Sequence, residues 1–404
     1  MGATGRGSGS ATVTRWSRAL VVVGVGFFVA WQVAVLAGYP RSSTVVLGVF
    51  GFVFHVVFGK AYGLVPSYFA RELAVPWAPA VHLPFAALGT VGTFLGRAEI
   101  GLAAAEPVGL ALWTAGCLVF VGSLGLTVRD NLTGAETGTG NVDGHRERVD
   151  RAANAVVPLV IAYLLVGSLL AFFEGIGLES PLLSAGPATT HLLAAGTAGL
   201  LVFAIGFRLL PRLLVVDPRI PLVAVVLPAG AIGPALLAID LHGGWLFQVG
   251  ASLQAIALVA FAVAYADMYR RSERRRVGGW TILAGVGFGA LAAVLGLSFA
   301  AGLEIGSSTA FDVHYRLAVG GFLGLTIVGV TYHFYPPAIA SQRFVDDRTA
   351  GVAAAALAVG LALEATVLVV DASALEVVGR TFSVLGAVLY AVVLGTIFLE
   401  RGFT

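Results

Sequence analysis

Long apolar stretches follow one another along this chain, with short polar segments between them. Most continue for about 20 residues, the length that an α-helix needs to cross the hydrocarbon core of a bilayer. The stretches are continuous rather than alternating, which excludes a membrane-spanning β-barrel. The pattern predicts an all-α polytopic membrane protein with twelve transmembrane helices, at residues 17–38, 44–66, 77–97, 104–127, 152–174, 187–211, 219–239, 243–268, 278–301, 309–337, 348–371 and 378–399.

Composition supports the same class of protein. Of the 404 residues, 58% are hydrophobic and 11% are charged, whereas a soluble domain carries about 25% charged residues. Cys117 is the only cysteine, so the chain alone can form neither a disulfide nor a thiolate metal site. Residues 1–16 are rich in Gly, Ser and Thr, and we expect a disordered N-terminus followed by an anchor helix rather than a removed signal. We expect the polar segment 128–151 to be a mobile loop.

The basic residues give the orientation of the predicted helices. Cytoplasmic loops of membrane proteins carry an excess of Lys and Arg. With both termini placed inside, 20 of the 24 basic residues fall on the inner side and 4 on the outer side. The outer four are Arg41, Arg97, Arg316 and Arg380. A miscounted span would have scrambled this asymmetry, so we predict a cell-membrane protein with both termini cytoplasmic.

Three of the predicted spans share a pattern. Spans 2, 6 and 10 all run from outside to inside, and all end at a proline, namely Pro66, Pro211 and Pro336. His191 precedes Pro211 by 20 residues and His314 precedes Pro336 by 22, so the two histidines have similar depth near the outer surface. The equivalent position in span 2 is Val46. These similarities predict three pseudo-equivalent four-helix groups, 17–127, 152–268 and 278–400, joined by the cytoplasmic loop 128–151 and the basic loop 269–277.

The same features resemble those of subunit I of the haem–copper oxidases, which has twelve helices and carries histidines on the second helix of a group. In span 10, Asp312-Val313-His314-Tyr315 resembles the opening of that family's tenth helix, and Tyr332-His333-Phe334-Tyr335-Pro336 resembles its aromatic ending. The motif from His191 to Gly196 is similar to the His-x4-Gly helices of the NnrS-like membrane haem proteins. The resemblance implies a haem, for which we expect the b type. Aligning the tyrosine puts Asp312 at the family's first ligand position, whereas aligning the proline puts His314 there.

Two motifs of the oxidases are missing from this sequence. Span 7, from Pro221 to Ile239, has no histidine pair, and span 6 lacks a His-Pro-Glu-Val-x-x-x-Tyr motif. We therefore expect no copper oxygen-reducing centre, and the sequence favours a role other than that of an enzyme.

His191 and His314 are the strongest candidates for metal and haem binding. Imidazole is a common haem ligand, and ionisable side chains within a bilayer often mark function. Two histidines at one depth on adjacent helices could hold one iron from both faces, with their ligating nitrogens about 4 Å apart. The competing interpretation is that both form hydrogen bonds to backbone or water near the surface. Arg316 could bind the haem propionates, or it could reach the lipid headgroups.

Other polar residues within the spans are weaker candidates. His55 lies in mid-membrane and could be a metal ligand, a proton relay or a packing residue. Glu364 in span 11 is a candidate proton carrier, since a lone buried carboxylate is costly. Lys60 could begin the same proton path or reach the inner interface. The other histidines are expected at interfaces or in solvated turns, and they are His82, His145, His242 and His333.

These observations lead to two functional hypotheses. The first is a haem-binding membrane protein that handles nitric oxide or electrons, with the lipid bilayer, a diatomic gas or a redox partner as its partners. The alternative is a proton-coupled secondary transporter without haem. No basic nucleic-acid face and no nucleotide-binding motif is present in the sequence, so we expect no nucleic-acid partner.

Overall fold

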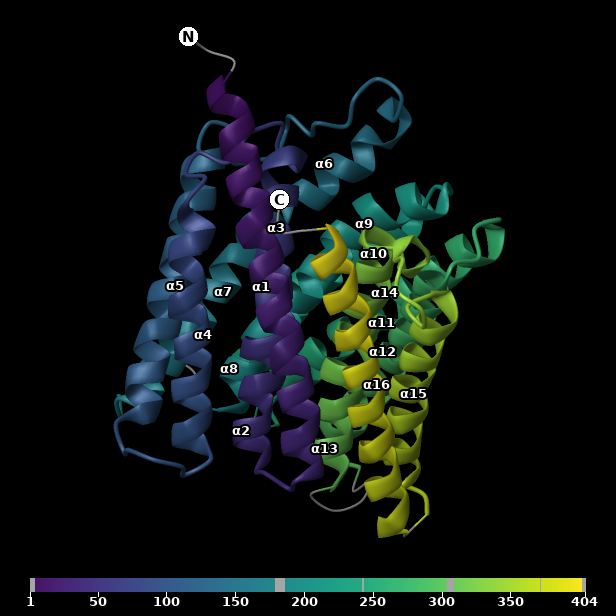
Figure 1. Cartoon of the computed structure of the whole chain (residues 1–404). Helices are drawn as coiled ribbons and strands as arrows, with labels where there is room; N and C mark the ends of the chain where they lie inside the picture. The colour runs from purple at the N-terminus through teal and green to yellow at the C-terminus, as the bar shows by residue number, and fades with distance from the viewer. Residues whose placement is uncertain (1–3, 179–185, 242, 304–308, 371, 402–404) are drawn as a thin grey trace.

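The computed structural model describes residues 4–178, 186–241, 243–303, 309–370 and 372–401, and it is a bundle of long helices (Figure 1). Twelve helices in the described residues are long and apolar enough to cross a membrane, which confirms the predicted number. Nine spans are built around one long helix each, namely α1 (Thr4–Leu36), α4 (Ala78–Arg97), α5 (Ala105–Val128), α7 (Val157–Gly175), α10 (Ile220–Ile239), α11 (Trp245–Arg271), α12 (Val277–Ala300), α15 (Asp347–Thr366) and α16 (Ser373–Arg401). The polar helix α6 (Glu147–Ala155) leads into α7 and follows the 3-10 turn η2 (Gly144–Arg146).

Spans 2, 6 and 10 are each divided into three helical segments. Span 2 comprises α2 (Arg41–Val45), η1 (Val46–Phe54) and α3 (His55–Tyr68). Span 6 comprises α8 (Pro187–His191), η3 (Leu192–Gly199) and α9 (Leu200–Leu214). Span 10 comprises α13 (Thr309–Tyr315), η4 (Arg316–Leu325) and α14 (Thr326–Phe334), followed by the 3-10 turn η5 (Pro337–Ile339).

The middle segments η1, η3 and η4 are π-helical, with 9, 8 and 10 residues. A π-helix is rare and is usually a single-turn bulge near a functional site. Here three such segments occupy the same place in their spans, and each contacts the other two. Spans 2, 6 and 10 are also the most enclosed, with 83%, 67% and 78% of their apolar windows buried, against at most 50% in the other spans. These three spans therefore form the interior of the bundle.

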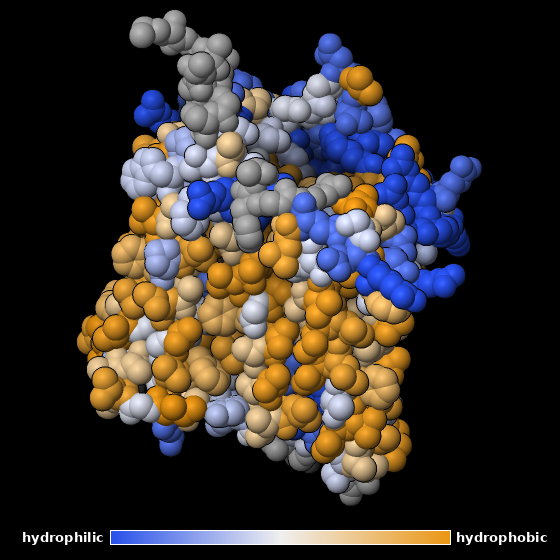
Figure 2. All heavy atoms as spheres, in the orientation of Figure 1, coloured by the Kyte–Doolittle hydropathy of each residue, from blue (hydrophilic) through white to orange (hydrophobic). Residues whose placement is uncertain are grey.

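The two ends of the bundle differ in polarity. We call the end at which α1 begins and α16 ends the basic end, since it carries the Arg270–Arg276 cluster, and the other the distal end (Figure 1). Hydrophilic side chains gather at the basic end, and a broad hydrophobic belt covers the rest of the face shown in Figure 2. This distribution is that of a protein with its apolar surface in lipid.

Close backbone contacts hold α12 against span 10. A Cβ on Gly278 would lie 2.4 Å from the Gly329 carbonyl oxygen, and one on Gly329 would lie 2.6 Å from that of Gly278. Small residues allow this approach, which supports helix association in lipid by van der Waals contact.

Two polar segments carry more structure than the sequence suggested. The stretch 4–16 is helical rather than disordered, because α1 begins at Thr4 and Val13 packs against the hydrophobic core. The loop 128–151 forms ion pairs with the basic end of span 2, and its mobility stays a prediction. Arg71 pairs with Asp130 at 2.9 Å and with Glu136 at 2.7 Å. These hydrogen bonds hold the pKa of both carboxyl groups below their ordinary values.

Candidate functional site

His191 and His314 lie close together near the distal end, on two of the three interior spans. Their ring centroids are 6.5 Å apart, and the ring planes are inclined by 25°. His191 is the last residue of α8, directly before η3, and His314 is the second-last residue of α13, two positions before η4 begins. Both side chains are partly exposed. The matched depth in the sequence thus corresponds to proximity in the fold.

Both imidazoles are fixed by one nitrogen and leave the other available. His191 Nδ1 lies 2.7 Å from the Pro187 carbonyl oxygen, and His314 Nδ1 lies 3.1 Å from that of Ala292 in α12. A carbonyl oxygen only accepts, so Nδ1 carries the proton and the Nε2 lone pair is free to bind a metal. Neither Nε2 has a hydrogen-bond partner among the described residues. This arrangement is the one that metal-ligating histidines typically show.

The surroundings of His314 also hold its ring in place. Phe299 of α12 meets it edge to face at 5.6 Å between centroids. One turn earlier, Gly296 leaves room for the imidazole, since a Cβ there would lie 3.2 Å from His314 Cε1. The orientation of the ring is therefore determined by α12 as well as by its own span.

Arg316 does not lie at the outer surface, where the charge pattern placed it. It is 4% exposed and makes a bidentate pair with Glu364 of α15, Nε to Oε2 at 2.7 Å and Nη2 to Oε1 at 2.8 Å. Gln32 of α1 accepts a further hydrogen bond from Nη2 at 2.8 Å. The guanidinium lies over the Trp31 ring at 4.9 Å. The carboxylate that meets Arg316 thus comes from the chain itself.

Glu364 is not the lone buried carboxylate that the sequence suggested. Besides Arg316, it accepts a hydrogen bond from Ser383 of α16 at 3.3 Å. No hydrogen bond or ion pair between described residues joins Glu364 to Lys60, which the sequence analysis grouped with it in one proton path. The structure separates these two groups, because Glu364 lies toward the distal end and Lys60 toward the basic end.

The remaining histidines have different environments. His55 is fully buried, with Nδ1 at 2.9 Å from the Phe50 carbonyl oxygen in η1, and the described residues offer no partner to its Nε2. His82 was expected at an interface, but it is fully buried and shares a hydrogen bond with the Tyr62 hydroxyl at 3.1 Å. His145 lies beside Asp217 in the exposed loop, as expected. His333 is partly buried against Gly278, and His242 lies outside the described residues.

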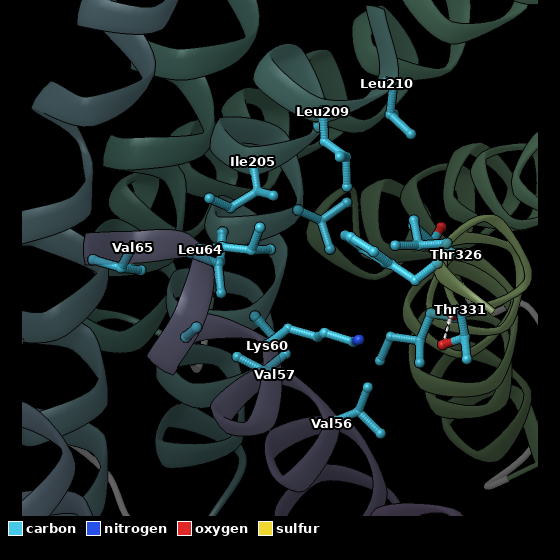
Figure 3. A pocket seen from close by; sticks show the side chains of 18 residues that line it. Val56, Val57, Lys60, Leu64, Val65, Ile205, Leu209, Leu210, Thr326 and Thr331 are labelled. Carbon is cyan, nitrogen blue, oxygen red and sulfur yellow. Dashed lines mark hydrogen bonds between the residues drawn. The ribbon is translucent and has the colours of Figure 1, made fainter. Parts of the chain in front are cut away.

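Lys60 lies at an apolar cavity of about 110 Å³ within the bundle (Figure 3). All of the residues that line this cavity come from spans 2, 6 and 10. The Lys60 ammonium donates a hydrogen bond to the Tyr335 hydroxyl at 2.7 Å. It also lies 4.1 Å from the centroid of the Tyr335 ring and 4.5 Å from that of Phe334. Neither the cavity nor the Tyr335 contact could be read from the sequence.

A second buried ionic cluster lies at the basic end and was missed by the sequence analysis. Asp150, which is 0% exposed, pairs with Arg212 at 2.7 Å and with Arg208 at 3.4 Å. Arg208 also donates to the Asn154 side chain and to the Thr137 carbonyl. The signal was the pair of arginines one turn apart in the last part of span 6, which was interpreted only as an orientation signal.

No known protein family model matches this chain, and no curated protein is detectably similar to it. Among the described residues, no group of three or more His, Cys, Asp or Glu side chains is placed to hold a metal ion. The His191–His314 pair offers two candidate ligands, and what it can do follows from its own geometry.

Proposed function

We propose that this chain is a haem-binding integral membrane protein in which His191 and His314 are the two axial ligands. The observation that carries the proposal is the 6.5 Å separation and 25° inclination of the two rings. With each metal–nitrogen bond about 2 Å long, the two ligating nitrogens come within about 4 Å, and the ring centroids lie somewhat farther apart. The observed centroid separation is compatible with one iron between the two Nε2 atoms.

The two histidines fit a haem in a second respect. Each Nδ1 is held by a backbone carbonyl, which fixes both imidazoles in the tautomer that offers Nε2. Arg316 fits less well as a propionate partner, since Glu364 already binds it on two nitrogens. The structure therefore supports the two histidines more strongly than the arginine. His55 makes no described ring contact with either of them, and as a metal ligand it stays a prediction from the sequence.

His191 and His314 would together hold the iron, and a haem held by two histidines would supply one-electron transfer. A diatomic gas needs an open position, which this pair would provide only if one imidazole moved away. Of the two roles considered, electron handling is therefore favoured over nitric oxide binding. The chain's own residues would hold both imidazole rings in place. Little structural reorganisation would then accompany the change of charge at the iron.

We further propose that the helices form three pseudo-equivalent groups of four and that the basic end is cytoplasmic. The first proposal is supported by the three π-helical segments at the same place in spans 2, 6 and 10 and by their mutual contacts. The second is supported by the gathering of arginines at one end of the bundle.

The test is the absorption spectrum of the purified full-length protein, with metal analysis of the same sample. We expect a Soret band, and we expect His191→Ala and His314→Ala each to abolish the bis-histidine spectrum while the thermal unfolding curve persists. His145→Ala, in the exposed loop, is the matched control and should leave the spectrum unchanged. Stoichiometric copper or zinc without haem would contradict the proposal, as would an unchanged haem spectrum in the double variant.

Proton-coupled transport remains the alternative, and the cavity between spans 2, 6 and 10 is the observation in its favour. Reconstituted protein that acidifies or alkalinises vesicles during solute uptake, while showing no Soret band, would support it. In that case Lys60→Met should abolish the proton movement, whereas His145→Ala should not.

A further inference from the structure

The cavity beside Lys60 lies within the interior of the bundle and is almost wholly apolar. Its walls are made by α3, by α9 with Ala198 of η3, and by α14, which belong to spans 2, 6 and 10. Figure 3 shows Val56, Leu64, Ile205 and Leu209 around the space, with Lys60 extending across it. Besides Lys60, the polar members of the lining are Thr326 and Thr331. The Thr331 hydroxyl donates to the Ile327 carbonyl at 2.7 Å, so it does not serve the cavity.

The part of the chain that the structure describes places no carboxylate beside the Lys60 ammonium at this apolar space. Among the described residues, no Asp or Glu oxygen lies within 4.0 Å of its ammonium, although the buried cations Arg208 and Arg316 each have one. The neighbours of the ammonium are the Tyr335 hydroxyl and the faces of two aromatic rings. Arg18 of α1 adds a second positive charge nearby. A cation within the bilayer is costly unless it is paired.

An apolar cavity with an uncompensated cation at its rim matches an amphiphile of opposite charge. The ammonium reaches toward Phe334 and Tyr335, where span 10 ends, so an anionic head would lie toward the basic end. The tail would then extend along Val56, Ala198 and Thr326 toward the middle of the bundle. We propose that this cavity binds a single-chain aliphatic carboxylate, with the carboxylate on Lys60 Nζ and the chain in the apolar space.

The size of the cavity limits the ligand. Since a dry apolar cavity of about 150 Å³ accepts a benzene ring, a cavity of about 110 Å³ encloses only a few carbon atoms. A two-chain phospholipid would have most of its chain length outside this volume. A neutral apolar molecule would fit but would leave the Lys60 charge unbalanced. The proposal uses neither histidine, so it stands or fails independently of haem binding.

The experiment measures binding of hexanoate to the full-length protein in nanodiscs, by calorimetry and by the shift of the thermal unfolding midpoint. Hexanoate should bind and stabilise the protein, while acetate and hexanol should each bind at least tenfold more weakly, since one lacks the chain and the other the charge. Lys60→Met should lose at least tenfold in hexanoate affinity. Lys60→Arg should retain binding within about threefold, because it keeps the charge and the length.

Two further measurements separate this result from misfolding. Ala198→Leu places extra carbons in the cavity and should weaken hexanoate at least tenfold while the protein unfolds at an unchanged temperature. Lys60 is the only lysine, so hexanoate should slow its modification by an amine-reactive reagent at least tenfold. Equal binding of hexanol and hexanoate, or full hexanoate affinity in a folded Lys60→Met protein, would overturn the proposal.

Discussion

The Arg316 guanidinium and the Glu364 carboxylate form a bidentate ion pair inside the bundle, with N–O distances of 2.7 and 2.8 Å. Each of the two side chains is 5% exposed. The pair joins span 10 to span 11, and Arg316 lies two residues after His314 in the sequence. Gln32 and Ser383 add hydrogen bonds from spans 1 and 12. Four spans are thus connected through one polar cluster.

Removing one partner of this pair should destabilise the protein strongly. Glu364→Gln leaves the Arg316 charge buried and unpaired, and we expect a loss of about 3–5 kcal/mol in the free energy of unfolding. The matched control is Asp312→Asn, which breaks an exposed pair with Arg41 that also involves span 10 and whose side chains are 46% and 45% exposed. The control should cost at most about 1 kcal/mol. Unfolding in a denaturant series measures both values.

A double variant separates the cost of losing the ion pair from the cost of leaving one charge buried without a partner. Arg316→Met combined with Glu364→Leu removes both charges and should recover most of the stability that Glu364→Gln loses. If Glu364→Gln and Asp312→Asn proved equally mild, the pair would not be the enclosed one that the structure shows.

Asp150 should hold the loop 128–151 against the basic end. Asp150→Asn removes the carboxylate that faces Arg208 and Arg212, so the loop should open more often and expose its arginines to trypsin. We expect cleavage there to accelerate at least tenfold, which corresponds to about 1.4 kcal/mol of easier opening. Limited proteolysis followed by mass spectrometry of the fragments gives the rate and the site.

Glu147→Gln is the control for the loop experiment. Its pair with Arg151 is on the same helix, but the two side chains are 50% and 57% exposed. Cleavage in this variant should stay within about twofold of the natural protein, because exposed pairs contribute little. Equal acceleration in both variants would mean that general surface charge, not the buried cluster, holds the loop.

The orientation in the membrane can be tested with reporter fusions. Reporters joined after Arg276 and after Thr404 should both read as cytoplasmic, since the inner side carries most of the basic residues. If only one of the two reporters read as non-cytoplasmic, the number of spans between that position and the N-terminus could not be even, which would contradict the predicted spans. The same reading at both positions would reverse the proposed orientation while leaving the helices as they are.

The sequence by itself determined the twelve spans, because each apolar run must satisfy its own backbone hydrogen bonds in lipid and so forms a helix wherever it is long enough. It also determined depth: the distances from His191 to Pro211 and from His314 to Pro336 placed both rings near one end. Depth along a helix follows directly from residue number, since each residue advances the axis by a constant rise. For the same reason spans 2, 6 and 10 could be singled out before their packing was known.

Only the tertiary structure decided which side chains meet across the bundle. Arg316 and Glu364 are 48 residues apart, and the charge pattern placed the first at the outer surface and left the second unpaired. His82 was expected at an interface but is enclosed beside Tyr62, and the three π-helical segments left no recognisable signal in the apolar pattern. The reason is that the rotation of each helix about its axis and the choice of its neighbours depend on side-chain packing between distant segments. The same packing creates the cavity beside Lys60 and brings the two histidine rings to 6.5 Å.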